Sequence, residues 1–294
     1  MASVRRAYNK QDTRSAWLML APFLLFFLLF VLYPVFRTIY LSFTNNVMFT
    51  KSDWVGLKNY IRLFTKDTAF LKALKNTSIY ALFSIAGLTT LGFLTAAAMN
   101  SPMRGTKWIR MLLIYPYATS MTAVAMVWLM LYDPLTGYLN KFLQMMGFLP
   151  KKWLYDESLA LPCLIFVNIW KNIGYCMLIY LAGMQSIPDE LYEAATVDGA
   201  NERVKLLHIT LPALRPVVFF VLVTTTVEAF KTFEQVQIMT RGDPMYATTT
   251  IVHQIYQRGF NEYKMGYASA MAVVLLVILL TLTMLNYRLS SAND

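Results

Sequence analysis

Six windows of about 20 mostly apolar residues recur along this chain of 294 residues. A helix of that length crosses the hydrocarbon layer of a bilayer, where every backbone polar group has to be paired within the chain. We therefore predict an all-α, polytopic membrane protein with six transmembrane helices. The predicted spans are Trp17–Phe43, Ser78–Met99, Trp108–Tyr132, Leu159–Met184, Pro216–Met239 and Gly266–Tyr287.

The composition fits a chain that lies mostly in lipid. Hydrophobic residues make up 57% of it and charged residues 14%, whereas about 25% of a soluble domain is charged. The net charge of +10 would suit nucleic acid in a soluble protein. Here Lys and Arg lie mainly between the apolar windows, so we expect membrane lipid and not nucleic acid beside them.

The distribution of positive charge leaves the orientation in the membrane open. An even number of spans puts both termini on one side, and cytoplasmic loops favour Lys and Arg. The side of the termini holds Arg5, Arg6, Lys10, Arg14, Arg104, Lys107, Arg203, Lys205 and Arg288. The first loop on the opposite side holds Lys51, Lys58, Arg62, Lys66, Lys72 and Lys75.

The connecting segments carry their own signals. Apolar residues at spacings of three and four within 45–76 predict short amphipathic helices at the interface, and Gly and Pro within 133–157 indicate turns. Cys163 and Cys176 lie thirteen positions apart in one predicted helix, too far for a disulfide. His208 and His253 have no partners at metal-ligand spacing, so no metal site is expected.

A short exposed helix is predicted between the fourth and fifth spans. Ser186 and Asp189 resemble a capping box, Pro188 suits the first turn, and acidic residues crowd the positive end of the helix dipole. Gly199 provides a left-handed stop. These features by themselves also fit an ordinary solvated connector.

The residues of this segment resemble the signature loop of the permease subunits of binding-protein-dependent ABC importers. The resemblance is carried by Glu193-Ala194-Ala195, Gly199 and Leu211-Pro212, and it extends to the maltose-type sugar permeases through Arg241-Gly242-Asp243-Pro244, Ala247-Thr248-Thr249-Thr250 and Met265-Gly266-Tyr267-Ala268-Ser269-Ala270. Asp243 departs from the family, in which many members carry a second glycine. The maltose permease itself also has extra N-terminal helices, so this chain resembles the shorter six-span form.

The resemblance implies a type I importer permease fold and a function. The chain is expected to translocate a sugar, an oligosaccharide or a related polyol, without being an enzyme. ATP and Mg are expected to be used by a partner, because no Gly-Lys dipeptide of a P-loop occurs. The implied partners are a second homologous permease in a heterodimer, two ATPase subunits or domains, and an extracytoplasmic solute-binding protein.

The resemblance also implies an orientation, because the signature loop has to face the cytoplasmic ATPase. The chain is expected in a bacterial or archaeal cytoplasmic membrane, with a permease domain at 17–288, a coupling loop at 185–213, and cytoplasmic tails at 1–16 and 289–294. The residues expected to couple to the ATPase are Asp189, Glu190, Tyr192, Glu193, Ala194, Ala195, Asp198 and Gly199.

Polar side chains at membrane depth are costly and tend to face a cavity. In the fourth span, polar residues recur at helical spacing on one face, and further candidates lie in the third and fifth spans. Several match positions that the family uses near the sugar. The predicted substrate residues are Asn168, Trp170, Lys171, Asn172, Tyr175, Tyr117, Met121, Glu228 and Thr232.

Several alternatives stay open at this stage. The polar groups could make interhelical hydrogen bonds that serve helix association alone. Lys171 would suit an acidic sugar or a glycerol phosphate, unless it pairs with Glu228; Lys231 is spaced to pair with Glu228 and Glu234. An ion-coupled carrier or channel shares the helices but needs no docking loop. An intramembrane protease is disfavoured because no His-Glu-x-x-His or Gly-x-Gly-Asp occurs.

Overall fold

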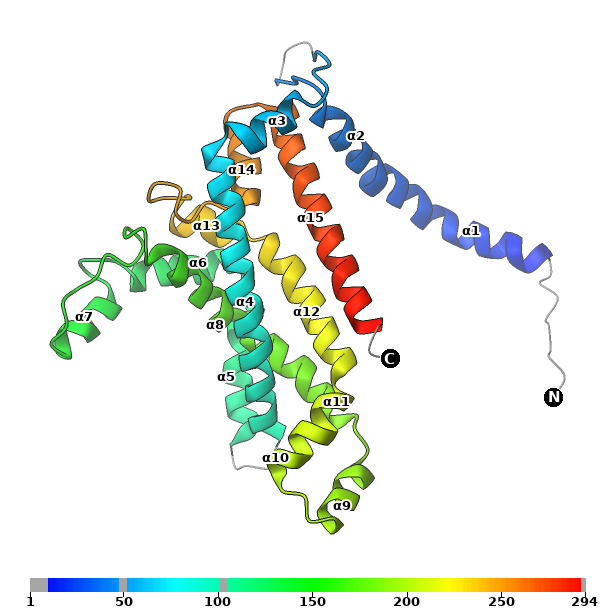
Figure 1. Cartoon of the computed structure of the whole chain (residues 1–294), viewed down its shortest axis with the longest axis vertical. Helices are drawn as coiled ribbons and strands as arrows, with labels where there is room; N and C mark the ends of the chain where they lie inside the picture. Colours follow the sequence, from blue (N-terminus) through cyan, green and yellow to red (C-terminus); the bar gives the residue numbers. More distant parts are fainter. Residues whose placement is uncertain (1–9, 48–51, 101–104, 292–294) are drawn as a thin grey trace.

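The computed structural model describes residues 10–47, 52–100 and 105–291, and these residues form helices joined by short connections (Figure 1). The predicted all-α class is confirmed, since the described residues contain only an isolated β-bridge between Thr44 and Trp54. Arg5, Arg6, Lys51 and Arg104 lie outside the described residues. The helices are α1 Lys10–Phe27, α2 Tyr33–Ser42, α3 Lys58–Thr65, α4 Thr68–Asn100, α5 Thr106–Ala118, α6 Met121–Leu131, α7 Tyr138–Met145, α8 Ala160–Gln185, α9 Asp189–Val197, α10 Glu202–Lys205, α11 Leu211–Ala213, α12 Arg215–Phe230, α13 Glu234–Met239, α14 Ile251–Tyr256 and α15 Met265–Ser291, with π-helical turns at Leu28–Leu32, Leu206–Thr210 and Gln257–Asn261.

Five helical segments of the described chain are long and apolar enough to cross a membrane. They are Ser15–Ser42, Thr68–Asn100, Ala160–Gln185, Arg215–Met239 and Met265–Arg288. The third predicted span, Trp108–Tyr132, is wrong as a continuous helix, because α5 and α6 are bent by 102° relative to each other. Thr119 is extended after Pro116, and Ser120 then caps α6 by accepting from the Ala123 N–H at 3.2 Å. The count is six only when this bent pair is one span.

The fifth predicted span also contains a break. The α12 helix ends at Phe230 and α13 begins at Glu234. The freed carbonyl of Thr232 accepts a hydrogen bond from the Thr250 hydroxyl at 3.0 Å. Backbone breaks at membrane depth are tolerated where such partners exist.

The centre of the bundle is the pair α4 and α8, which lie side by side along much of their length (Figure 1). Small residues allow this approach: a Cβ at Gly92 would lie 2.7 Å from Cβ of Cys176. The α12 helix contacts α4, α8 and α15. Cys163 and Cys176 are both buried and free, as the thirteen-residue spacing predicted.

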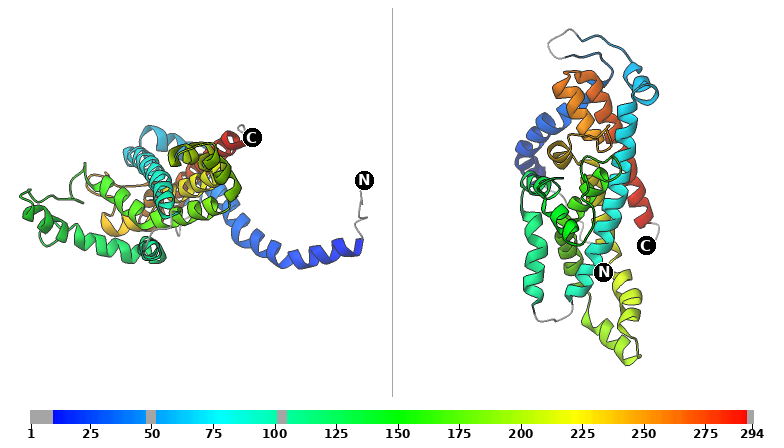
Figure 2. Two further views of the ribbon diagram at one scale, coloured as in Figure 1. Left: turned by 90° about the horizontal axis from the view of Figure 1, so that it is seen from below. Right: turned by 90° about the vertical axis from the view of Figure 1, so that its left-hand side faces the viewer.

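The first apolar helix is the least buried part of the bundle. None of the residues in its most apolar stretch is buried, and only α2 lies against α15, whereas α1 diverges from the other helices (Figures 1 and 2). Lipid or another chain therefore has to cover this surface.

The connecting segments contain more helix than predicted. The amphipathic helix in 45–76 is confirmed as α3, but the apolar residues at 70–74 belong to α4, which begins at Thr68 with Asp67 as its N-cap. The sequence analysis missed α7 within 133–157 and α14 after the fifth span.

Candidate functional site: a polar cavity and a projecting helix

A cavity of about 660 Å³ lies where α8 faces the two broken spans. The break between α5 and α6 contributes one wall, and the break between α12 and α13 contributes another. Eight of the nine predicted substrate residues line this cavity: Tyr117, Met121, Asn168, Lys171, Asn172, Tyr175, Glu228 and Thr232. The tertiary structure therefore brings together residues that lie up to 115 positions apart (117 to 232).

Trp170 is the exception, because it does not line the cavity. It lies two residues after Asn168, which turns it about 200° away around the helix. Its ring is 40% exposed and lies edge-on to Trp128, with 5.4 Å between the ring centroids. The Trp170 ring therefore forms no part of the cavity wall.

Lys171 is buried and binds a backbone carbonyl, a contact that was not predicted from the sequence. Its Nζ donates to the carbonyl of Tyr117 at 3.0 Å and lies 5.3 Å from the centre of the Tyr117 ring. The Tyr117 ring in turn stacks on Tyr175, with centroids 4.6 Å apart and planes 14° apart. The ammonium group thus holds the end of α5 and a pair of stacked rings at the cavity wall.

The ion pairs that the spacing left open are not formed in the cavity. Glu228, Lys231 and Glu234 all line it and are exposed, but none of them forms a salt bridge in the part of the chain that the structure describes. The break between α12 and α13 removes the helical spacing on which the pairing of Lys231 with Glu234 depended. Lys171 does not pair with Glu228 because its Nζ binds the Tyr117 carbonyl.

The remaining polar groups are amides and hydroxyls. The Asn172 side chain donates to the backbone and side-chain oxygens of Asn168, each at 2.9 Å. Buried Gln235 donates to the Tyr80 hydroxyl, and its own Oε1 has no hydrogen-bond partner. The sequence analysis missed Leu88, Val223 and Phe233 among the lining residues. No signal could have found them, since apolar residues at membrane depth have the same composition whether they face lipid or a cavity.

The predicted exposed helix is present as α9, at the end of the molecule opposite α3 (Figure 1). None of its residues is buried. The predicted capping box is wrong: Pro188 is the N-cap without a side-chain bond, and the Ser186 hydroxyl donates to the Gly183 carbonyl at 2.8 Å. The acidic first turn, Asp189 and Glu190, is confirmed.

The other end of α9 is closed by a glycine. Gly199 adopts φ +78°, and the N–H groups of Gly199 and Ala200 bond back to Thr196 and Ala195 at 3.1 and 2.9 Å. The Tyr192 hydroxyl bonds to Thr210 Oγ1 at 2.9 Å. This contact ties α9 to the π-helical turn that leads into the fifth span.

The outer surface of α9 has no partner within the described chain. Glu193, Ala194 and Asp198 are exposed, and Leu191 and Val197 are 49% and 88% exposed. A nine-residue helix is marginal in water without tertiary support. The helix thus offers small, acidic and apolar side chains to another molecule.

A bundle of membrane helices, a polar cavity beside broken spans and a projecting helix between the fourth and fifth spans are together the features of a membrane permease. The chain belongs to the family of binding-protein-dependent transport system inner membrane components, which it matches over residues 88–292. It is the permease subunit of an ABC importer, and the expected family is confirmed.

Known relatives agree with this assignment. The arabinooligosaccharides transport permease AraP of Bacillus subtilis (strain 168) is 33% identical, over 97% of this chain and 90% of the relative. The sn-glycerol-3-phosphate permease UgpA of Agrobacterium fabrum (strain C58) is 33% identical, over 92% and 93%. A bacterial ABC transporter for the acidic polysaccharide alginate has a similar structure, with a TM-score of 0.86, 27% identity, and coverage of 96% of this chain and 98% of that one.

Proposed function

We propose that this chain is the translocation subunit of an ATP-driven importer that carries a sugar, an oligosaccharide or a related polyol across the cytoplasmic membrane. The observation that carries the proposal is the cavity of about 660 Å³, lined by seven predicted polar or aromatic residues and Met121, and placed beside two broken spans. Its amides and hydroxyls are groups that hydrogen-bond a hydroxyl-rich solute. The stacked rings of Tyr117 and Tyr175 add an apolar wall for the face of a sugar ring.

The substrate is proposed to be uncharged. The formal charges lining the cavity balance, with Lys171 and Lys231 against Glu228 and Glu234. The ammonium of Lys171 is already bound to a backbone carbonyl, so it offers little to an anionic solute. Named relatives include permeases for arabinooligosaccharides and for glycerol 3-phosphate, and the charge balance favours the first of these chemistries.

The coupling role is assigned to α9. The ATPase would be a separate protein that uses ATP and Mg, and its surface would cover the exposed face of α9. Glu193 is exposed near the middle of that face, where a carboxylate can accept charge-assisted hydrogen bonds. Because Tyr192 bonds to Thr210, a displacement of α9 would be passed to the fifth span and so to the cavity wall.

The remaining partners follow from the family. A second homologous permease would complete the pathway, two ATPase subunits would bind the coupling helices, and an extracytoplasmic solute-binding protein would deliver the sugar. In that assembly α9 and both termini are cytoplasmic, and α3 lies on the extracytoplasmic side.

Uptake by whole cells tests the proposal. A strain without the chromosomal copy is complemented with the wild-type chain, Glu193→Ala or the control Glu157→Ala, an exposed acid outside α9. Labelled neutral and acidic sugars are then offered. We expect uptake of a neutral sugar to be restored by the wild type and the control and to fall about tenfold or more with Glu193→Ala, because a charged hydrogen bond contributes about 1.5–3 kcal/mol.

The main alternative is an ion-coupled carrier or channel. To test this alternative, the purified chain alone is placed in liposomes across which an ion gradient is applied. Solute accumulation without an ATPase subunit would overturn the proposed function, as would uptake that is insensitive to ATP depletion in cells.

A further inference from the structure

A second, smaller pocket of about 250 Å³ is lined by α3, by the start of α4, by the loop at Tyr246 and by the π-helical turn after α14. Its walls combine three cations with one anion. The lining residues are Arg62, Lys66, Asp67, Thr68, Ala69, Tyr246 and Arg258. This site shares no residue with the cavity described above.

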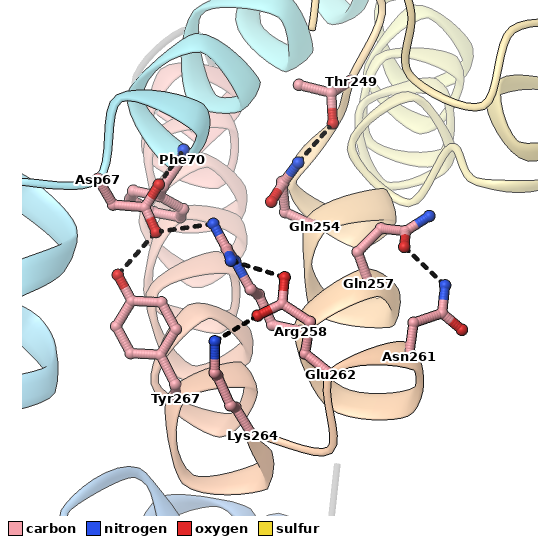
Figure 3. A network of polar contacts seen from close by, with 10 residues as sticks. All are labelled: Asp67, Phe70, Thr249, Gln254, Gln257, Arg258, Asn261, Glu262, Lys264 and Tyr267. Carbon is pink, nitrogen blue, oxygen red and sulfur yellow. Dashed lines mark hydrogen bonds and ion pairs between the residues drawn. The ribbon is translucent and has the colours of Figure 1, made fainter.

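The anion in this pocket is Asp67, which already binds neighbouring groups of the chain (Figure 3). Asp67 Oδ1 accepts from the Phe70 N–H at 3.0 Å and thereby caps α4. Its Oδ2 accepts from the Tyr267 hydroxyl at 2.8 Å and lies 3.5 Å from the Arg258 guanidinium. Asp67 therefore joins α4, α15 and the π-helical turn after α14 into one rigid wall.

Two of the three cations are not neutralised. Arg258 binds Glu262 at 2.7 Å in addition to Asp67, although its buried Nε has no hydrogen-bond partner. Arg62 and Lys66 are exposed and form no salt bridge with any described residue. The guanidinium of Arg62 lies over the Tyr267 ring at 5.1 Å, so it is oriented but its charge is not cancelled.

The position of these cations is unfavourable for membrane insertion. Under the proposed function, on which this inference rests, the pocket is extracytoplasmic, and Lys and Arg are disfavoured in short extracytoplasmic loops. A basic surface that persists there attracts an acidic partner, speeds the encounter and fixes its orientation. The family's description names a protein partner, since transport depends on a binding protein.

We propose that this pocket receives a single carboxylate side chain of the extracytoplasmic solute-binding protein, held by Arg62 and Lys66 against the wall built on Asp67. A protein is favoured over a lipid headgroup because Tyr246, at 50% exposure, lines the same pocket as Arg62 and Arg258. Tyr and Arg are enriched in protein interfaces.

The test uses the complete transporter, purified in nanodiscs, and the solute-binding protein whose deletion abolishes uptake in the same cells. Lys66→Glu is compared with Lys58→Glu, which changes an exposed lysine on α3 that does not line the pocket. We expect Lys66→Glu to weaken binding of the solute-binding protein about tenfold and to flatten its salt dependence. Lys58→Glu should change both by less than about twofold, and ATP hydrolysis without the binding protein should be unchanged in both variants.

A carbodiimide gives a second readout that does not depend on a variant. It joins the Lys66 amine and a nearby carboxylate as an amide, with loss of water, and mass spectrometry then locates the linked peptide. We expect a link from Lys66 to an aspartate or glutamate of the solute-binding protein.

Three outcomes would overturn the proposal. These are equal binding by Lys66→Glu and wild type, a Lys66 link only within the permease, and an effect of Lys66→Glu that vanishes when anionic lipid is left out of the nanodiscs. The last outcome would assign the pocket to a lipid headgroup. Failure of the proposed function itself looks different, because the wild-type transporter would then show no hydrolysis stimulated by a binding protein.

Discussion

Lys171 Nζ on α8 donates to the carbonyl oxygen of Tyr117 on α5 at 3.0 Å. In an uninterrupted helix that carbonyl would accept from the N–H of Met121, four residues later. Because the chain breaks at Thr119 and Ser120, the carbonyl loses its helical partner and Lys171 replaces it. Lys171 therefore acts as a cap for α5 and positions the cavity wall, while the sugar-facing surface is left to the rings of Tyr117 and Tyr175.

Replacing Lys171 with methionine tests this positioning role. The variant keeps the apolar stem but leaves the Tyr117 carbonyl unpaired, which costs about 1.5–3 kcal/mol for a bond to a charged donor. We expect a lower unfolding temperature and a raised KM for uptake, by a similar factor for neutral and acidic sugars. Lys171→Arg should recover most of the loss, and Lys152→Met, at an exposed lysine, should resemble the wild type. A loss confined to acidic sugars would show instead that Lys171 contacts an anionic substrate.

Gly199→Ala is expected to uncouple transport. A Cβ at Gly199 meets no atom within 4 Å, so the cost is confined to the left-handed backbone at φ +78°, about 1–3 kcal/mol. The end of α9 should therefore shift without unfolding the bundle, and uptake per ATP hydrolysed should fall severalfold. Gly147→Ala is the matched control, since Gly147 also has an open Cβ position and φ +82° but lies outside the coupling loop. Equal coupling ratios in both variants would refute the prediction.

Gly174→Ala should be much more damaging to the fold. The new Cβ would lie 2.0 Å from the carbonyl oxygen of Leu113, a backbone atom of α5 that cannot move alone. Separation of α5 from α8 would open the stack of Tyr117 on Tyr175, so we expect little folded protein after purification. In Gly183→Ala, on the same helix, the Cβ meets only side-chain atoms of Val217 and Leu214. Gel filtration in detergent should show a folded peak for this control and an aggregate for Gly174→Ala.

We predict that the protein is less stable in acid because of His253. Asn261 donates to Oε1 of Gln257 at 2.6 Å, so the Gln257 amide nitrogen faces His253 Nε2 at 3.3 Å and makes it the acceptor. Nδ1 then carries the proton that is donated to the Thr249 hydroxyl at 3.0 Å. The neutral ring is therefore the form that this network accommodates.

The sign of the pH effect follows from this arrangement. Burial lowers the pKa of His253 from its ordinary value, and Asp243 offsets this only in part. The unfolded chain takes up the proton near pH ~6.5. The contribution of His253 to the free energy of unfolding is therefore constant above that pH and falls as the pH decreases toward the lower folded pKa.

The temperature at which buried Cys163 and Cys176 react with a fluorescent thiol reagent measures this stability. Between pH 7.5 and pH 5.5, about two pH units around the ordinary histidine value, His253→Gln should lower the unfolding temperature at neutral pH but flatten its decline in acid. An equally steep decline in the variant would assign the acid sensitivity to other groups.

The sequence by itself determined the spans, the helix α9 and eight of the residues that line the cavity. Lipid excludes unpaired backbone groups, so continuous apolar runs have to become helices, whatever their neighbours are. Polar residues such as Asn168 and Glu228 are costly in that environment, which makes a cavity their predictable location. Gly199 was identified for a local reason as well, because a left-handed residue ends a helix.

Only the tertiary structure decided where the spans break and how charges are paired. The break after Pro116 is stable because Lys171, 54 positions after Tyr117, donates to the freed Tyr117 carbonyl. The break at Thr232 is stable because the Thr250 hydroxyl donates to the Thr232 carbonyl. Because its Nζ binds the Tyr117 carbonyl, Lys171 does not pair with Glu228. Trp170 lies on another face of α8 and contacts Trp128. These outcomes depend on which neighbouring helix presents a hydrogen-bond donor to a freed carbonyl, and that is a property of three-dimensional contact between distant segments.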